Sequence, residues 1–190
     1  AFFLFLTYVP LSYEPWEDFM YCWIWGVWKE YFDFTYDDSS IKGKLKDGER
    51  YIFFEFPHGI FPMGQVLSAS HIRDITPGKM VCGSGADAVF MFPVMRQIMS
   101  WIGTKRATKE NFAKTFEEGN YAAVIPGGIA EMYLVDNNNK ETESVYFKSR
   151  YGTVKMALQQ GANIIPVFFF GNTNILSVVG SSNGLAKLSR

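Results

Sequence analysis

The chain has 190 residues, long enough to bury one substantial core, and a net charge of −1 with its charged side chains dispersed. It therefore lacks the basic surface that nucleic-acid binding requires, and that class of partner is excluded. Phe, Trp and Tyr make up 17% of the residues, and such rings favour the boundary between lipid and water. An aromatic-rich core would give the same composition, so both interpretations stay open.

The two cysteines, Cys22 and Cys82, form neither a disulfide pattern nor the spacing of a metal site, and we expect no bound metal. The sequence has no Asn-x-Ser/Thr acceptor, so nothing points to a secreted or lumenal domain. The apolar run 1–9 is shorter than the roughly 20 residues of a membrane-spanning helix. It would fit the tail of a spanning segment, and we expect the chain to be a fragment of a longer protein.

Residues 1–40 form an aromatic and apolar region. The segment 14–18, Glu-Pro-Trp-Glu-Asp, is typical of a helix start, since proline suits the first turn and acids favour its positive end. Apolar side chains then recur at helical spacing over 19–32, on a face wider than a soluble surface helix needs. We prefer a helix lying in or against a membrane, with a core helix as the alternative. The polar segment 37–50 is expected to act as a linker.

From Tyr51 onward, short apolar strands alternate with helical patterns. Strands are expected at 51–56, 79–82, 121–125 and 163–170. Helices are expected after Gly59, near 92–101, at 108–118 and at 151–160. A hairpin is expected between 132–135 and 143–147, across the turn 136–140. Strands that alternate with helices predict a layered α/β fold.

His58 and His71 are the only histidines, so the search for an imidazole base is short. His58 lies in Phe56-Pro57-His58-Gly59, directly after a predicted strand, where α/β sheets bind their ligands. Proline and glycine on either side predict a tight turn that displays the ring. A structural turn histidine would show the same pattern, and taken alone the two interpretations are equal. His71 is expected at the surface or in a supporting position.

A second candidate element is the segment 125–131, Ile-Pro-Gly-Gly-Ile-Ala-Glu, in which a predicted strand runs into two glycines. Glycines let backbone N–H groups approach a ligand closely, so Gly127 and Gly128, with Gly59 of the histidine turn, are candidates to stabilise an oxyanion. Glu131 is the carboxylate expected to orient His58 or to stabilise its cation. The alternative is an ordinary glycine turn with an exposed glutamate.

Two further segments, 103–106 and 147–150, place basic side chains beside short strands or turns. Arg106, Lys148 and Arg150 are the candidates there for contacts with phosphate groups. Each segment by itself is also compatible with a solvated charged face.

Several sequence blocks follow one another in a characteristic order. They are Tyr51-Ile52-Phe53, Pro57-His58-Gly59, Ile125-Pro126-Gly127-Gly128 with Ala130-Glu131, Arg150-Tyr151-Gly152, Val154-Lys155-Met156-Ala157-Leu158, Gly161-Ala162, Ile165-Pro166-Val167 and Phe170-Gly171-Asn172. In this order they resemble the type-2 diacylglycerol acyltransferases, a family that includes related monoacylglycerol and wax-ester acyltransferases. The resemblance covers roughly residues 23–174 and is specific because the blocks occur jointly.

The resemblance implies a glycerolipid-acyltransferase-like fold over residues 41–190, in which helices flank a mixed sheet. This domain would be incomplete at its C-terminal end, and a membrane-associated aromatic helical region, 1–40, would precede it. It implies an enzyme of the endoplasmic reticulum membrane and lipid droplets with its active site facing the cytosol. The reaction would transfer a fatty acyl group from acyl-CoA to diacylglycerol, giving triacylglycerol without a cofactor. Partners would be acyl-CoA, a lipid alcohol and the membrane, with a homo-oligomer left open.

The resemblance also suggests roles for individual residues. His58 matches the family's catalytic histidine, Glu131 belongs to its glycine-rich block, and Arg106 and Arg150 match its basic positions. Phe56 replaces the first residue of the usual His-Pro-His-Gly, and the usual Gly-Glu-Asn reads Gly171-Asn172-Thr173. Met63 stands where the broader superfamily has the Asp of a His–Asp dyad, so Glu131 is expected to substitute for it.

The mechanism expected from these residues is direct acyl transfer. His58 removes the proton of the acceptor hydroxyl, the oxygen attacks the thioester carbonyl, and CoA thiolate leaves. Neither cysteine has a setting that would support a covalent acyl-enzyme. The alternatives are acyl transfer to monoacylglycerol, a long-chain alcohol or a lysophospholipid, a catalytically silent lipid-binding homologue, and a soluble enzyme.

Overall fold

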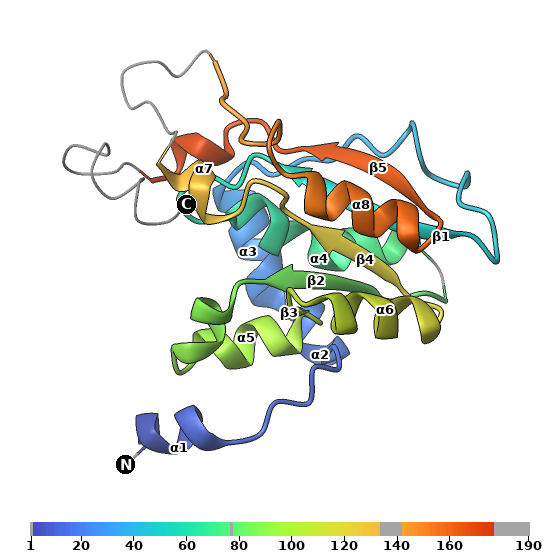
Figure 1. The fold of residues 1–190 in the computed structure, drawn as a ribbon. Helices are drawn as coiled ribbons and strands as arrows, with labels where there is room; N and C mark the ends of the chain where they lie inside the picture. Colours follow the sequence, from blue (N-terminus) through green and yellow to red (C-terminus); the bar gives the residue numbers. More distant parts are fainter. Residues whose placement is uncertain (1, 77, 134–141, 177–190) are drawn as a thin grey trace.

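The computed structural model describes residues 2–76, 78–133 and 142–176 (Figure 1). Its strands are β1 (Arg50–Phe56), β2 (Val81–Gly85), β3 (Lys105–Arg106), β4 (Tyr121–Val124) and β5 (Ala162–Phe168). Its α-helices are α1 (Phe2–Tyr8), α2 (Glu17–Met20), α3 (Trp23–Tyr31), α4 (Met63–Ile75), α5 (Met95–Trp101), α6 (Lys109–Glu117), α7 (Ile129–Met132) and α8 (Tyr151–Gln159). Two short 3₁₀ helices are η1 (Asp87–Met91) and η2 (Asn172–Asn174).

The described strands form one sheet in the order β3-β2-β4-β1-β5, and every neighbouring pair is parallel. The α/β fold is therefore confirmed, but the expectation of a mixed sheet was wrong for the described residues. Helices connect the strands, as parallel neighbours require. The predicted hairpin would have supplied an antiparallel pair, yet Met132 ends α7, no strand forms at 143–147, and the turn 136–140 lies outside the described residues.

β1 is buried from Tyr51 to Glu55, because a central strand of a parallel sheet is covered on both faces. Ile52 and Phe54 pack with residues of α6 and α8 on one face. Tyr51 and Phe53 pack against Ile72 of α4 on the other. The side chains alternate between the two helical layers, so β1 fixes the position of whatever follows its carboxyl end.

The other predicted elements match the structure with small shifts. The strands at 51–56, 121–125 and 163–170 and the helices at 108–118 and 151–160 correspond to β1, β4, β5, α6 and α8. β2 begins and ends later than predicted, and the stretch 92–101 divides into an irregular segment followed by α5. The helix expected after Gly59 is α4, which begins at Met63.

The N-terminal helices pack on the rest of the chain through part of their aromatic surface. Met20 of α2 and Trp25 of α3 are buried in one cluster with Leu67 of α4 and Met99 of α5. The other side of α3 remains open, with Trp23 and Tyr31 strongly exposed. Within the described residues, no helix has the length and apolar character needed to cross a bilayer.

Candidate functional site

The two predicted catalytic segments meet at the carboxyl edge of the sheet. His58 follows β1, the segment 125–131 follows β4, and these strands are parallel neighbours with Phe54 opposite Val124. Because parallel neighbours end at the same edge, the backbone N–H of His58 comes within 2.6 Å of the Glu131 carboxylate. The structure thus brings together His58, Gly127, Gly128 and Glu131, as the sequence predicted.

Glu131 is buried and holds the backbone on two sides. Its Oε2 accepts the N–H of His58 at 2.6 Å, and its Oε1 accepts the N–H of Tyr146 at 2.9 Å. The sequence suggested that this carboxylate would orient the imidazole, but these hydrogen bonds fix the backbone of the histidine turn. Burial lowers the pKa of His58, and the negative charge of Glu131 acts on the ring by opposing that effect.

The imidazole of His58 is oriented by its own turn. Its Nδ1 lies 2.8 Å from the carbonyl oxygen of Gly59, which can only accept a hydrogen bond. Nδ1 must therefore carry the proton, and in the neutral ring Nε2 keeps a free lone pair. Burial lowers the pKa of His58, against the opposing effects of the Gly59 carbonyl and the Glu131 charge. The ring is thus neutral near pH 7, in the tautomer of a base acting through Nε2.

The structure gives a reason for a glycine at position 127 that the sequence did not reveal. A side chain at this position would overlap the Glu131 carboxylate, which folds back over it. The Gly128 N–H donates to the carbonyl of Ile125 at 3.1 Å, so it is committed to the turn. No hydrogen bond within the described residues engages the Gly127 N–H, which makes Gly127 the better candidate of the two for an oxyanion donor.

Two buried amides support the histidine turn from behind, and neither was predicted from the sequence to have a role. Asn172 Nδ2 donates to the carbonyls of Pro57 at 2.9 Å and His58 at 3.0 Å. Gln65 Nε2 donates to the same Pro57 carbonyl at 2.8 Å. Asn172 stood in the final block of the family resemblance, which was the available signal. Gln65 gave no signal, because its role depends on how α4 sits behind the turn.

The predicted basic residues lie in three different settings. Arg150 Nη2 donates to the carbonyl of Gly127 at 3.3 Å, and its guanidinium lies 4.9 Å from the centre of the Tyr146 ring, so it borders the site. Lys148 is exposed to solvent. Arg106 lies on β3 and is paired with Asp87 of η1 at 2.6 Å. β3 is three strand spacings away from β1 in the sheet, a distance of about 14 Å.

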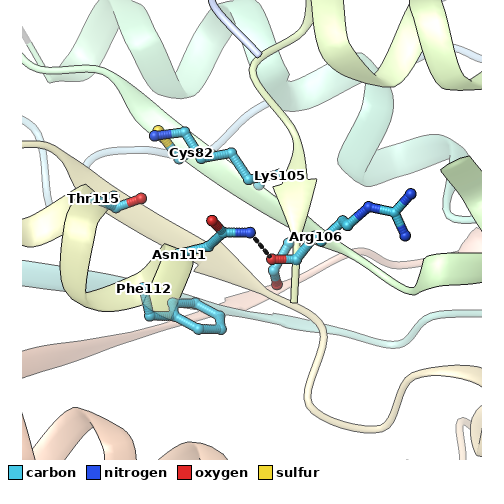
Figure 2. A pocket seen from close by; sticks show the side chains of 8 residues that line it. Cys82, Lys105, Arg106, Asn111, Phe112 and Thr115 are labelled. Carbon is cyan, nitrogen blue, oxygen red and sulfur yellow. Dashed lines mark hydrogen bonds between the residues drawn. The ribbon is translucent and has the colours of Figure 1, made fainter. Parts of the chain in front are cut away.

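Arg106 borders a small hollow between β2, β3 and α6 that is open to solvent (Figure 2). The lining residues are Cys82, Gly83, Ser84, Lys105, Arg106, Asn111, Phe112 and Thr115. Lys105 is itself paired with Glu118 at 3.1 Å, and burial raises the pKa of the Cys82 thiol. Figure 2 shows the Arg106 side chain extending away from Cys82 and Thr115. The enclosed part of this hollow has room for about one water-sized group, so it does not form a ligand site of the usual size.

His71 lies outside this arrangement. Its ring stacks on Tyr36 with centroids 3.6 Å apart, and its Nε2 lies 3.2 Å from Asp38. Among the residues that the structure covers, no group of three or more His, Cys, Asp or Glu side chains is placed to hold a metal ion.

Comparison with known proteins places the chain among lipid acyltransferases. It is 28% identical to the 2-acylglycerol O-acyltransferase 1 of Mus musculus over 197 residues, covering 96% of this chain and 58% of the relative. It is 26% identical to the diacylglycerol O-acyltransferase 1 of Eremothecium gossypii over 179 residues, covering 92% and 38% respectively. It is 29% identical to the acyl-CoA wax alcohol acyltransferase 2 of Homo sapiens over 159 residues, covering 80% and 46%.

The chain thus spans about half the length of the curated relatives it matches. No solved structure matches it. The family model described as diacylglycerol acyltransferase matches residues 13–188, nearly the whole sequence. The His58 turn and the segment 125–131, which meet at the sheet edge, both lie inside this match. The chain belongs to the diacylglycerol acyltransferase family.

Proposed function

We propose that this protein is an acyl-CoA-dependent O-acyltransferase that transfers a fatty acyl group to diacylglycerol and forms triacylglycerol. The observation that carries the proposal is the contact between His58 Nδ1 and the Gly59 carbonyl, which leaves Nε2 as the proton acceptor of a neutral ring. Family membership supports the reaction class. The setting of His58 supports its role as the base.

The reaction proceeds by direct transfer. His58 Nε2 takes the hydroxyl proton of the acceptor while the oxygen forms a bond to the thioester carbonyl carbon. The tetrahedral oxyanion is stabilised by the Gly127 N–H. The carbon–sulfur bond then breaks, the sulfur leaves with the electron pair, and the proton on His58 passes to the CoA thiolate. Cys82 takes no part as a nucleophile, because burial raises the pKa of its thiol and keeps it protonated.

Acyl-CoA brings phosphates that need cationic partners. Arg150 is the nearest candidate, since its guanidinium contacts the Gly127 carbonyl beside the reacting centre. Lys148 is exposed two residues away and can reach the same ligand. Arg106 would meet a more distant part of an extended CoA molecule, with Asp87 as the competitor for its guanidinium.

The relatives and the exposed aromatic side chains support the proposed acceptor and location. The names of the three relatives include a 2-acylglycerol, a diacylglycerol and a wax alcohol acyltransferase at nearly equal identity, so monoacylglycerol and long-chain alcohols are the alternative acceptors. The enzyme would work at the endoplasmic reticulum membrane or a lipid droplet with its site facing the cytosol. The exposed Trp23 and Tyr31 of α3 support association with a lipid surface.

The test is transfer of a labelled acyl group from acyl-CoA by the full protein in membranes, with diacylglycerol, monoacylglycerol and a long-chain alcohol as acceptors. His58→Ala should abolish product formation with every acceptor, whereas His71→Ala should retain it. His71 is the matched control because its ring packs on Tyr36 outside the site. Full activity of the His58→Ala protein would overturn the assignment of the base. Absence of any acyl product from the wild type would overturn the proposed function.

A further inference from the structure

The turn that carries His58 depends on contacts from outside itself. Gly59 has a φ of 62°, and a Cβ at this position would lie 2.9 Å from the carbonyl oxygen of Asn172. The turn and the segment after β5 are therefore packed backbone against backbone. The two segments are 114 residues apart in sequence.

Asn172 connects three parts of the site through one buried side chain, which is 3% exposed. Its Nδ2 donates to the carbonyls of Pro57 and His58 at 2.9 and 3.0 Å. Its Oδ1 accepts the N–H of Gly64, in the first turn of α4, at 2.9 Å. The orientation of the amide is unambiguous, because the oxygen faces a donor and the nitrogen faces carbonyl oxygens.

Gln65 completes this arrangement from α4. Its Nε2 donates to the Pro57 carbonyl at 2.8 Å, and its Oε1 lies 3.2 Å from Asn172 Nδ2, whose two hydrogens are shared among three acceptors. Both amides are buried, and a buried amide that loses its partners costs free energy. The pair therefore has a well-defined arrangement, which in turn restrains the Pro57 and His58 carbonyls.

The backbone of His58 is consequently held from two directions. Glu131 accepts its N–H from the side of β4, and Asn172 donates to its carbonyl from the side of β5. With the peptide units on both sides of the Cα fixed, the imidazole can reach the Gly59 carbonyl and remain partly buried. Removing the Asn172 side chain frees one of these two restraints while leaving every group on the ring in place.

We propose that Asn172 is a positioning residue for acyl transfer, which holds the His58 carbonyl so that Nε2 faces the substrates in the correct geometry. This role rests on the proposed function of His58 as the base. Asn172 does not touch the substrates in this scheme. Its effect falls on the orientation and the burial of the imidazole.

The experiment compares the wild-type protein with Asn172→Ala and Asn172→Asp. The Asp variant keeps the size of the side chain and the acceptor for the Gly64 N–H but turns an oxygen towards the two carbonyls, so it should weaken the hold on the turn at least as much as Ala does. The matched control is Asn163→Ala, which removes an amide at the opposite end of β5, where Nδ2 donates to Glu49 at 3.0 Å. Thermal unfolding of each variant checks that it is folded.

The first measurement is reaction of the two histidines with diethyl pyrocarbonate as a function of pH, read by peptide mass spectrometry. The reagent attacks neutral imidazole, so its pH dependence reports the pKa of each ring. Burial lowers the pKa of His58 in the wild type, with Glu131 as the ionisable group that opposes this effect. In Asn172→Ala, His58 should react faster and its pKa should rise towards the ordinary value of about 6.5. His71 should react as in the wild type, which makes it the internal reference.

The second measurement is acyl transfer. A catalytic group displaced by about 1 Å can lose on the order of 10²-fold in rate, so kcat of both Asn172 variants should fall by that order while KM for acyl-CoA stays unchanged. An unchanged His58 reactivity and an unchanged kcat in a folded Asn172 variant would overturn the positioning role even if the wild type is active. A wild type without acyl transfer whose His58 reactivity still responds to Asn172→Ala would refute the proposed function, and with it the role in acyl transfer, while showing that Asn172 holds the His58 turn.

Discussion

Replacing Glu131 with glutamine tests the buried carboxylate with the smallest change of shape. The carboxylate accepts the N–H groups of His58 and Tyr146 with its two oxygens. A glutamine offers one oxygen and one NH₂ group in the same space. One of the two backbone N–H groups must then face another donor, wherever the oxygen is placed.

The magnitude follows from these two contacts. A hydrogen bond to a charged group contributes about 1.5–3 kcal/mol, and a buried N–H left without a partner costs about 1–3 kcal/mol. One bond is lost and the other becomes neutral, so the free energy of unfolding of Glu131→Gln should fall by about 3 kcal/mol. The comparable change Glu117→Gln, at an exposed position of α6, should leave it unchanged.

The same substitution should shift the pH dependence of activity. The negative charge of Glu131 raises the pKa of His58, so its removal lowers that pKa further. His58 works as a base only when it is neutral, and activity is lost as pH falls through its pKa. The acidic limb of kcat/KM should therefore move to lower pH in Glu131→Gln, and the maximal rate should fall because the turn is less well held.

Chemical denaturation and the pH profile of acyl transfer measure the two effects separately. A Glu131→Gln protein that is as stable as the wild type would contradict the hydrogen-bond argument. An acidic limb at the wild-type pH, or shifted upward, would contradict the electrostatic argument. Glu117→Gln provides the baseline for both measurements.

Two further predictions concern Gly127 and Glu55. Gly127→Ala should destabilise the protein by about 3 kcal/mol, because the added methyl group displaces the Glu131 carboxylate. The same substitution should cost much less stability in a Glu131→Ala background, and a double-mutant cycle measured by chemical denaturation checks this. Glu55 is buried on β1, and burial raises its pKa to about 8. The folded state then favours the neutral acid, so this group costs stability as pH rises from about 4.5 to about 8. Glu55→Gln should therefore raise the unfolding temperature at pH 8–9 but not below pH 4.5. If the unfolding temperatures of wild type and variant differ by the same amount at every pH in this range, the argument is refuted.

The sequence predicted the meeting of His58 with the segment 125–131 because both follow short apolar runs that read as strands. Strand ends of an α/β sheet share an edge, so the two segments could be expected near each other without knowledge of the strand order. The aromatic segment 19–32 was less decisive. The segment is helical, but it divides into α2 and α3 between Met20 and Trp23. The same aromatic pattern fits a buried surface and a lipid-facing one, and α3 has a buried side and an exposed side.

The contacts that depend on strand order were not visible in the sequence. Asn172 reaches the histidine turn because β5 lies beside β1, a pairing that no local pattern encodes. β3 is only two residues long, too short for a periodicity to reveal it. The purpose of Gly127 was also hidden, because a glycine that makes room for a carboxylate four residues later looks like a glycine that exposes its N–H.

Under the proposed mechanism, the work of a His–Asp dyad is divided between two groups, which accounts for Met63 at the position of the Asp. In such a dyad one carboxylate orients the ring and stabilises its cation, whereas here the Gly59 carbonyl holds Nδ1 and Glu131 supplies the charge from the backbone side. Burial lowers the pKa of His58, and a neutral carbonyl on the ring opposes this effect less than a carboxylate would, so the ring stays neutral at physiological pH. Because orientation and charge come from different groups, loss of the Glu131 charge should weaken the base without abolishing it, in contrast to loss of the imidazole itself.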